Sequence, residues 1–526
     1  MCGIAGFFAL TPRPLAPRGV LERMVEAVRH RGPDDAGVYL DRRAGLGHRR
    51  LSIIDLAGGK QPLATADEKL WVTFNGEIFN YVELTAELVA RGCQFRTRSD
   101  TETILHAYAE YGPACVESFN GDFAYAIWDR NRERLVMARD RMGVRPLYYT
   151  VHDGVLVFAS EVKSLFLYPG LRAELDPLGL DQCFTFWSPL APRTAFKGVQ
   201  ELPPGHQLIA EDGRIKVEPY WKLRFPPRGG RSSADGDETG EQVEALLADA
   251  TRIRMRADVP VGAYLSGGFD SSVTTALAKR HNEGLRTFSL EFESPELDES
   301  AYQRTLVEAL RTDHSLLRCK GGDIAASFEQ VIRHTERPVL RAAPAALYLL
   351  ARQVRDHGFK VVLTGEGADE VFGGYDIFKE ALVRRFWARQ PDSKWRPLLL
   401  RRLYPYLGGL QSQPSRYLEA FFRQGLDASG DPLFSHLPRA IVERPKQPYR
   451  APDSESFLHA GAPGYVDALL APEAIGRAGY FEPRAVRRLV DKCRNPLGPV
   501  SAGDNMAFVG ILSTQLLHSC FVQALI

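Results

Sequence analysis

The most distinctive chemistry in the sequence belongs to Cys2, because removal of Met1 would leave its thiol beside a free α-amine. An α-amine has a pKa of about 8 and can take the thiol proton, so one residue would supply both a nucleophile and its base. Taken alone, a cysteine after the initiator methionine is equally consistent with an incidental small residue. Cys2 is therefore predicted to be a nucleophile only if the rest of the chain offers a substrate site.

Polar clusters beside predicted turns offer such a site. They lie at residues 30–34, 49–55, 75–77 and 99–100. A glutamine substrate needs a cation for its α-carboxylate, an anion for its α-ammonium group, and donors for the oxyanion that forms when its amide is attacked. The clusters supply all three. Each also has a simpler interpretation: Arg50 as an exposed strand residue, Asn75 and Gly76 as a hairpin turn, and Asp100 as a helix N-cap, a role compatible with substrate binding.

A second group of residues suits phosphate chemistry. The run at 266–272 reads Ser-Gly-Gly-Phe-Asp-Ser-Ser and lies between an apolar stretch and a helical pattern. Small residues let backbone amides approach phosphate oxygens, and the helix N-terminus adds a favourable dipole, although such a turn alone is as often an ordinary loop. Neither GxxxxGK[ST] nor GxGxxG occurs, which disfavours a kinase-like grip on a γ-phosphate. The predicted phosphate-binding residues are Ser266, Gly267, Gly268, Asp270, Ser271 and Ser272.

Residues 364–375 form a second glycine-rich loop, with carboxylates at Glu366, Asp369 and Glu370. Acidic residues among glycines make a poor core sequence and suit the rim of an active site, although an acidic surface turn is the simpler alternative. One of these carboxylates, paired with Asp270, would hold Mg²⁺ on a leaving pyrophosphate.

The elements that must position these residues fall into two halves. In the first, alternating or apolar runs predict strands, and apolar residues at helical spacing predict helices over 82–91 and 101–111. Its predicted strands are residues 70–74, 123–128 and 155–159. Residues 224–240 are rich in Pro, Gly, Ser and charge, which is typical of a linker. In the second half, helical patterns alternate with buried runs and predict an α/β parallel sheet. These runs are residues 259–265, 285–290 and 360–363.

The composition is that of a soluble protein with two domains. A chain of 526 residues exceeds what one core usually organises, and its 66 Lys+Arg nearly cancel its 65 Asp+Glu, which argues against a nucleic-acid partner. Seven cysteines without CxxC pairs favour a reducing cytoplasm. The chain shows no signal-peptide pattern and no run of about 20 apolar residues, so no membrane partner is expected. The sequence does not fix the oligomeric state, and a homodimer is compatible with it.

The polar clusters belong to longer motifs that resemble the class II glutamine amidotransferases over residues 1 to about 210. These motifs are MCGIAGF, RHRGPD, RRLSIID, FNGEIFNY and SDTE, followed by DRMGVRPLY, FASE and LPPG. The resemblance implies an αββα amino-terminal nucleophile fold for residues 1–223, with Cys2 as nucleophile and Asn75 and the Gly76 amide as oxyanion hole. It further implies a glutamine site made of Arg50 on the carboxylate, Leu51, Ser52, Ile53, Ile54, and Glu77 and Asp100 on the head group.

This domain followed by the two glycine-rich loops resembles glutamine-dependent asparagine synthetases, and the resemblance continues through residues 501–521. It implies an ATP-pyrophosphatase fold for residues 241–526, with glutamine, aspartate and ATP as substrates and Mg²⁺ as cofactor. By this resemblance Leu265, Ser266 and Leu290 line the nucleotide and Thr364 and Gly365 close over it. Asp270 and Asp369 serve Mg²⁺, Glu366 lies near the acyl-adenylate, and Arg341 binds the aspartate carboxylate.

The resemblance breaks between His436 and Leu437. There the family carries several dozen further residues, including a lysine implied to stabilise charge during adenylation. Either the segment is deleted, which would make synthetase activity doubtful, or the given sequence omits it, which the well-matched flanks favour. Two other functions stay open: an amide synthetase of a natural-product pathway acting on a different carboxylate, and a non-catalytic descendant that binds glutamine or nucleotide.

Overall fold

The computed structural model describes most of the chain. The described residues are 1–224, 236–293, 298–405, 412–431, 434–435, 454–459, 461–494 and 500–523. Residues 225–235 of the predicted linker, and the junction between His436 and Leu437, lie outside them. The helix α6 (Gly236–Arg254) begins within the segment whose composition is typical of a linker.

Two antiparallel six-stranded sheets form the first half. The first has the order β10 (Gln200–Glu201), β8 (Tyr148–His152), β9 (Val155–Ala159), β1 (Gly3–Ala9), β3 (Ala44–Arg50), β2 (Asp35–Leu40). The second has the order β12 (Arg214–Pro219), β11 (His206–Glu211), β7 (Arg134–Arg139), β6 (Gly121–Asp129), β5 (Leu70–Ile78), β4 (Leu63–Ala64).

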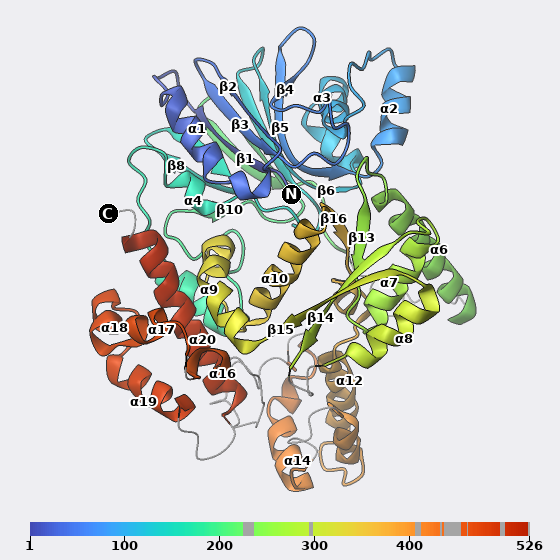
Figure 1. Ribbon diagram of the computed structural model, residues 1–526, viewed down its shortest axis with the longest axis vertical. Coiled ribbons are helices and arrows are strands. Elements are labelled where there is room, and N and C mark those ends of the chain that lie inside the picture. Colours follow the sequence, from blue (N-terminus) through green and yellow to red (C-terminus); the bar gives the residue numbers. More distant parts are fainter. Residues whose placement is uncertain are drawn as a thin grey trace.

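The alternation of side chains along β1 explains the layers. Phe8 packs between the two sheets against Trp128 of the second sheet, whereas Phe7 points the other way, into the cluster that contains Met24 of α1 (Arg18–Glu26). The outer face of the second sheet is covered by α2 (Tyr81–Ala90) and α3 (Asp100–Tyr111). The predicted αββα sandwich is therefore confirmed (Figure 1).

Two of the simpler alternative interpretations in this half are wrong. Asn75 and Gly76 lie inside the nine-residue strand β5 and not in a hairpin turn. Asp100 is the first residue of α3, and the N-cap is Ser99, whose hydroxyl accepts a hydrogen bond from the Thr101 backbone N–H at 3.2 Å. The side chains of Asn75 and Asp100 are therefore available for another role, because Asn75 does not form a turn and Asp100 is not the N-cap of the helix.

A four-stranded parallel sheet forms the centre of the second half. Its order is β15 (Asp313–Cys319), β14 (Arg286–Phe292), β13 (Val261–Tyr264), β16 (Val361–Leu363). The predicted parallel strands are thus confirmed, while β15 was not predicted because this half-exposed edge strand begins with Asp313 and His314 and contains no apolar run. On its faces lie α7 (Phe269–Lys279), α8 (Ser300–Leu310), α9 (Gly321–Thr335) and α10 (Ala343–Asp356) (Figure 1).

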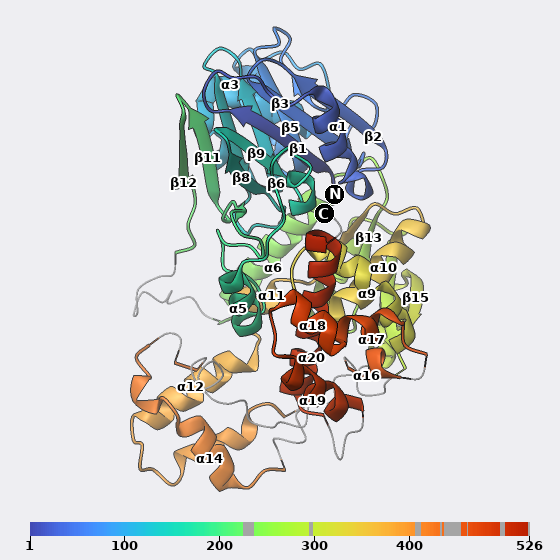
Figure 2. The same ribbon diagram turned by 90° about the vertical axis from the view of Figure 1, so that its left-hand side faces the viewer.

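The remaining helices are mostly short. They are α4 (Val162–Leu165), α5 (Pro177–Phe186), α11 (Ala368–Phe372), α12 (Asp376–Ala388), α14 (Ser415–Arg423), α16 (Glu455–Leu458), α17 (Tyr465–Leu470), α18 (Pro472–Ala478), α19 (Pro483–Arg494) and α20 (Ala502–Leu517). In addition there are short turns of other helix types, η1 (Arg29–Arg31), η2 (Gly112–Ser118), η3 (Arg396–Arg402), η4 (Leu426–Ala428) and η5 (His518–Gln523). Figure 2 shows α12 and α14 as a lobe set apart from the rest of the second half.

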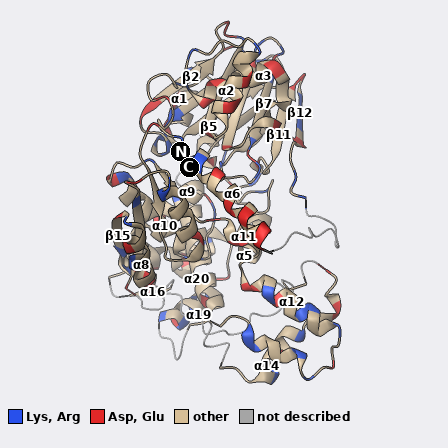
Figure 3. Ribbon diagram, turned by 90° about the vertical axis from the view of Figure 1, so that its right-hand side faces the viewer, with Lys and Arg blue, Asp and Glu red and all other residues tan. Residues whose placement is uncertain are grey.

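The helix α20 joins the two halves. Together with η5 it spans 22 residues that are apolar enough to cross a membrane, but 67% of its apolar window is buried inside the protein, as in the core helix of a globular domain. Its Phe508 and Leu512 belong to the same core cluster as Phe7 of β1. The two halves therefore share a hydrophobic core. Basic and acidic residues are interspersed along most elements, in keeping with a net charge of +1 (Figure 3).

Candidate functional sites

The register of the first sheet brings Cys2 to its pocket. Gly3 at the start of β1 pairs with Arg49 near the end of β3, so Cys2 lies beside the residues that follow β3. The Leu51 backbone N–H donates a hydrogen bond to the Cys2 thiol sulfur at 3.3 Å. Figure 1 shows that the N-terminus lies where the two halves of the chain meet.

Most of the predicted glutamine-binding residues share one pocket with Cys2. Its lining contains Cys2, Arg50, Leu51, Ile53, Ile54, Gly76, Glu77 and Asp100 from the predicted set, and also Gly59, Gln61, Phe74, Ser99 and Thr101. Ser52 and Asn75 are not among the lining residues: Ser52 donates its N–H to Asp34 at 2.8 Å, and Asn75 is completely buried in β5. The pocket therefore joins β1, β5, the start of α3 and the loop after β3.

Arg50 is buried, with 5% of its surface exposed, so its interpretation as an exposed strand residue is wrong. Its guanidinium donates hydrogen bonds to the carbonyl oxygens of Ile54 at 3.1 Å, Asp55 at 2.6 Å and Leu56 at 3.0 Å. A Cβ on Gly59 would lie 2.4 Å from the Arg50 Nη2, so this position must be glycine for the guanidinium to fit. The loop at residues 54–56 thus wraps around the Arg50 guanidinium, which contributes a positive charge to the pocket.

The Asn75 side chain combines complete burial with an amide group that is unpaired among the described residues. Its side chain is 0% exposed, yet neither atom of its amide group has a hydrogen-bond partner among the described residues. A buried polar group left unpaired costs about 1–3 kcal/mol, so this arrangement is best explained by a ligand that completes it. The next residue, Gly76, has φ of +154°, and a Cβ there would lie 2.1 Å from the Asp122 carbonyl oxygen, so only glycine fits.

The pocket contains two carboxyl groups, those of Glu77 and Asp100, which in their ionised form can bind a cation. Burial is the main cause that raises the pKa of Glu77 to about 7, with Arg145 partly opposing it. Burial likewise raises the pKa of Asp100 to about 6, although its carboxylate accepts a hydrogen bond from the Ile78 N–H at 3.0 Å. The sequence reasoning missed Arg145, which occurs in the DRMGVRPLY motif. A bound α-ammonium group would favour the ionised form of both carboxylates.

Glutamine binding should therefore release protons in mildly acid solution. Above pH 7 the carboxyl groups of Glu77 and Asp100 are mostly ionised, and as the pH falls through 7 and then 6 each must lose a proton before it can bind the ammonium group. The KM for glutamine should rise by up to about tenfold per pH unit for each protonated group. Calorimetry on a Cys2→Ala variant at pH 6.5, in buffers of different ionisation enthalpy, measures the proton release. Binding heats that do not depend on the buffer would contradict this assignment.

The Cys2 thiol is held in its neutral form. Burial raises the pKa of the Cys2 thiol, and it also lowers the pKa of the Met1 amine to about 5. While Met1 is attached, the nitrogen of Cys2 is an amide without basicity. A thiol in these surroundings needs a base very close to it, and the α-amine exposed by Met1 removal would be such a base.

The second pocket lies at the carboxyl ends of the parallel strands. From the predicted set its lining contains Leu265, Ser266, Gly268, Asp270, Ser271, Leu290, Thr364, Gly365, Glu366 and Asp369. Gly367, Glu370 and Tyr375 of the predicted loop at 364–375 also line it, whereas sequence reasoning missed Tyr264, Phe288, Ser289, Phe292, Glu299, Gln303, Leu347 and Leu350. Gly267 and Ser272 are not among the lining residues. The site follows from topology, because the C-terminal ends of neighbouring parallel strands meet at one sheet edge.

Two loops meet in this pocket. In the first, the Gly268 N–H donates to the Ser266 hydroxyl at 3.2 Å, and Gly267 has φ of +90°. The helix α7 starts at Phe269, directly after this turn, so its N-terminal dipole favours an anion there. In the second loop, a Cβ on Gly365 would lie 2.6 Å from the Ser271 nitrogen, so glycine permits the two loops to touch.

The charge of this pocket fits a nucleotide that arrives with Mg²⁺. Its lining includes the carboxylates of Asp270, Glu299, Glu366, Asp369 and Glu370 and, among the described residues, no Lys or Arg. A triphosphate would be repelled here unless divalent cations accompanied it. Carboxylate oxygens are the protein ligands that Mg²⁺ prefers, so the donor set fits the ion.

Arg341, predicted to bind the acceptor carboxylate, is not among the residues that line the pocket. It immediately precedes Ala342, the N-cap of α10, and its guanidinium lies over the ring of Trp187 from the first half, 5.3 Å from the ring centre. Its assignment to the acceptor carboxylate stays a prediction.

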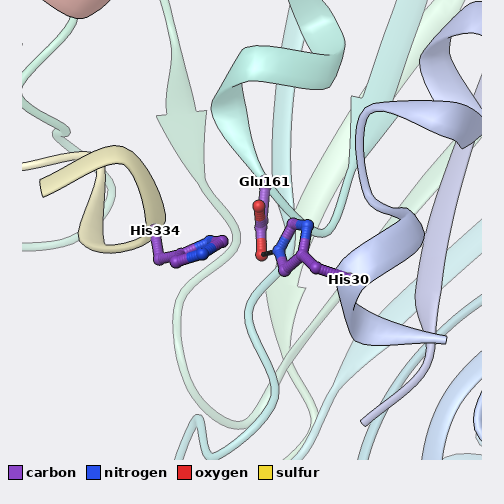
Figure 4. A group of neighbouring side chains, drawn as sticks. All are labelled: His30, Glu161 and His334. Carbon is purple, nitrogen blue, oxygen red and sulfur yellow. Dashed lines mark hydrogen bonds and ion pairs between the residues drawn. The ribbon is translucent and has the colours of Figure 1, made fainter. Parts of the chain in front are cut away.

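A third polar cluster crosses between the halves, where His334 of α9 approaches His30 and Glu161 (Figure 4). The Glu161 carboxylate interacts with His30 Nε2 and with Arg31 Nη1, each at 2.8 Å, and it also contacts Lys163. Ligand atoms of His30, Glu161 and His334 lie within 4.8 Å of one another, as in a metal site. Two permanent cations on the one carboxylate nevertheless oppose a divalent ion, so the cluster is better described as an interdomain ion-pair network.

Two known protein families match the two halves of the chain. Residues 1–221 match the glutamine amidotransferase domain family, and residues 242–432 and 433–519 match the asparagine synthase family. Together the two matches cover both pockets and all the motifs that define them.

Individual relatives are moderately similar. Asparagine synthetase [glutamine-hydrolyzing] 1 of Bacillus subtilis is 37% identical over 404 residues, which cover 76% of this chain and 63% of that protein. Amidase chyE of Penicillium rubens is 38% identical over 398 residues, covering 72% and 58%. A solved glutamine phosphoribosylpyrophosphate amidotransferase from B. subtilis is 16% identical, with a TM-score of 0.33 over 61% of this chain and 81% of that one.

The aligned part of the chain thus spans about three fifths of the length of these two curated relatives, 63% and 58%. The family matches extend over both halves, from residue 1 to residue 519. The chain therefore belongs to the asparagine synthase family and carries an amino-terminal glutamine amidotransferase domain.

Proposed function

We propose that this protein is a glutamine-dependent amide synthetase that hydrolyses glutamine at Cys2 and uses the ammonia to amidate a carboxylic acid activated by ATP. Aspartate is the preferred acceptor, and asparagine the product. The observation that carries the proposal is the first pocket, which combines a thiol, the cation of Arg50, the carboxylates of Glu77 and Asp100, and the unpaired amide of Asn75 beside it. These groups match each polar part of glutamine and of the oxyanion formed from it.

In the glutaminase reaction, the α-amine of Cys2 takes the thiol proton after Met1 has been removed. The thiolate sulfur attacks the side-chain amide carbon of glutamine, and the oxyanion accepts hydrogen bonds from the Asn75 side chain and the Gly76 N–H. Collapse of this intermediate expels ammonia, which takes the proton back from the amine, and leaves a thioester. Water then hydrolyses the thioester and releases glutamate.

In the synthetase reaction, the acceptor carboxylate attacks the α-phosphorus of ATP and pyrophosphate leaves, which gives an acyl-adenylate. Ammonia that has passed through the domain interface attacks the acyl carbon and displaces AMP. Asp270 and Asp369 would hold Mg²⁺, which neutralises charge on the pyrophosphate. The amides at the start of α7 bind phosphate oxygens. Every described cysteine is a free thiol, which suits a reducing cytoplasm.

A natural-product amide synthetase with another acceptor is the second candidate. It is supported by relatives that carry the name amidase, of which chyE is 38% identical. The absence of Arg341 from the lining of the described pocket also weakens the argument for a dicarboxylate acceptor.

Product analysis with ¹⁵N-amide-labelled glutamine, ATP, Mg²⁺ and a panel of carboxylic acids tests both candidates. The proposal predicts AMP and pyrophosphate in equal amounts and a ¹⁵N-labelled amide, with aspartate as the best acid. A preference for another acid would support the second candidate. Formation of ADP and phosphate, or glutamate without any labelled amide, would contradict amide synthesis by this route.

A further inference from the structure

The loop at residues 51–56 forms one wall of the glutamine pocket, and we call it the glutamine loop. Its Leu51, Ile53 and Ile54 line the pocket beside Arg50. Asp55 in this loop has φ of +50°, a left-handed backbone conformation that is uncommon for residues other than glycine, and contacts of its backbone and of its side chain support it. The contacts that supply this support decide whether the wall is in place.

Asp258 of the second half binds the glutamine loop at two points. Its backbone N–H donates to the Ile53 carbonyl oxygen at 2.9 Å, and its carboxylate accepts from the Asp55 N–H at 2.7 Å. The two contacts lie on either side of Ile54 in the chain. Asp258 is separated from Ile53 by more than two hundred residues and lies just before β13, whose other end leads to the phosphate loop at Ser266.

Lys360 of the second half makes the next contact along the loop. Its ammonium group donates to the Ser52 carbonyl oxygen at 3.3 Å and to the Asp34 carboxylate at 2.6 Å. The same Asp34 oxygen accepts the Ser52 N–H at 2.8 Å. Partial burial would raise the pKa of Asp34, but the hydrogen bonds from Lys360 and Ser52 outweigh it and hold the pKa below its usual value. The Asp34 carboxylate therefore stays ionised at neutral pH.

We propose that Asp258 and Lys360 are positioning residues for glutamine: the synthetase half holds the glutamine loop in its binding conformation and so completes the pocket of the other half. This inference rests on the proposed glutaminase function. Three of the six loop residues, Ser52, Ile53 and Asp55, have backbone groups bonded across the interface. Neither residue is among those that line the pocket, so each acts through the loop.

The chain offers a matched control for general loosening of the interface. Arg256 also crosses between the halves, where it donates to the Phe79 carbonyl oxygen at 2.6 Å and pairs with Glu83 at 2.5 Å. Within the described structure, its hydrogen bonds go to Phe79 and Glu83 and not to the glutamine loop. An Arg256→Gln change removes an interdomain ion pair without removing a loop contact.

The test measures glutaminase kinetics for Asp258→Ala, Asp258→Asn, Lys360→Met and Arg256→Gln. Removal of a loop contact should raise the KM for glutamine about tenfold in Asp258→Ala and Lys360→Met, with kcat within about twofold. All three residues at position 258 keep the backbone N–H, but only asparagine and aspartate offer a side-chain oxygen to the Asp55 N–H. Asp258→Asn should therefore have a KM near that of the wild type. Arg256→Gln should also leave KM within about twofold.

Labelling of Cys2 gives a second readout that does not need turnover. A diazoketone analogue of glutamine should modify Cys2 about tenfold more slowly in Asp258→Ala at low reagent concentration, whereas iodoacetamide should react equally with both proteins. Equal KM and equal diazoketone labelling in wild type and Asp258→Ala would overturn the inference, as would a KM in Asp258→Asn as high as in the alanine variant. A wild type that the diazoketone does not label would instead overturn the proposed glutaminase function on which the inference rests.

Discussion

Replacing Cys2 by alanine is expected to lower glutamine hydrolysis by at least about a thousandfold, because it removes the only group that can form the thioester. The substitution deletes one buried sulfur atom and its hydrogen bond from the Leu51 N–H, so the pocket should keep its shape. Amide synthesis from added ammonium chloride should stay within about twofold of the wild type, because the second pocket has no residue in common with the first.

The control for this prediction is a Cys2→Ser variant. This variant keeps the α-amine and the size of the side chain, but a hydroxyl is a far weaker nucleophile than a thiol. The variant should therefore bind glutamine normally and hydrolyse it very slowly. Calorimetry measures the binding and a glutamate assay measures the hydrolysis. Hydrolysis by Cys2→Ala at more than a few per cent of the wild-type rate would disprove the assignment of Cys2.

The state of Met1 sets a condition on the same measurement. The Met1 amine lies in desolvated surroundings that lower its pKa to about 5, and the nitrogen of Cys2 is an amide until Met1 leaves. The glutaminase rate per molecule should therefore rise in proportion to the fraction of chains whose intact mass lacks the methionine. Because processing exposes the base, it is as necessary to the reaction as the thiol.

Sequence patterns predict those parts of the fold in which the signal is local. Strands β5, β6 and β9 and the parallel strands β13, β14 and β16 follow from apolar runs, because burial of one or both faces leaves a periodic trace in the sequence. The edge strand β15 was missed for the same reason, since it is half exposed and carries Asp313, His314 and Arg318. A strand can therefore be predicted from this sequence only where burial imposes an apolar pattern on it.

Residue types alone gave the wrong local structure at three positions of the first pocket. Arg50 is buried, Asn75 is in a strand, and Ser99 rather than Asp100 caps α3. In each case a polar side chain is buried, although polar residues are usually exposed. Interpretation from residue type alone fails at such positions, because a functional site can require an environment that is unusual for the residue. The pocket was predictable only because several motifs together matched the needs of one substrate.

Contacts between distant segments were beyond sequence reasoning. Asp258 and Lys360 meet the glutamine loop across more than two hundred intervening residues, and no local pattern records such a meeting. Gln61 was missed as well, although its side-chain oxygen accepts the Phe74 N–H at 2.7 Å and its amide donates to Thr101 at 3.2 Å. Single-sequence patterns carry no signal for these tertiary hydrogen bonds.

The second pocket raises a separate question of charge. Adenylation develops negative charge on the α-phosphate, yet the described lining contains no basic side chain. The family match is divided between residues 432 and 433, close to the break in resemblance between His436 and Leu437, where the resemblance implies a further segment with a lysine. Arg50 supplies positive charge in the first pocket. In the second pocket, positive charge must come from divalent cations or from residues outside the described lining.

Changing Asp270 to asparagine should therefore weaken MgATP binding by roughly a hundredfold, because the amide has no charge with which to hold a divalent cation against the phosphates. Calorimetric titration with MgATP measures this directly and does not require the chain to complete the reaction. The same variant should keep its glutaminase kinetics, since Asp270 lines only the second pocket.

Glu299→Gln is the matched control, because Glu299 lines the same pocket but lies outside the two glycine-rich loops that carry Asp270 and Asp369. It should weaken MgATP binding by no more than about threefold, and Asp369→Asn should behave like Asp270→Asn if both carboxylates hold one ion. Equal MgATP affinities for Asp270→Asn and the wild type would mean that the phosphates are neutralised elsewhere. Tighter MgATP binding by Asp270→Asn and Asp369→Asn would instead mean that the acidic lining repels the nucleotide, and it would contradict a Mg²⁺ site at these two carboxylates.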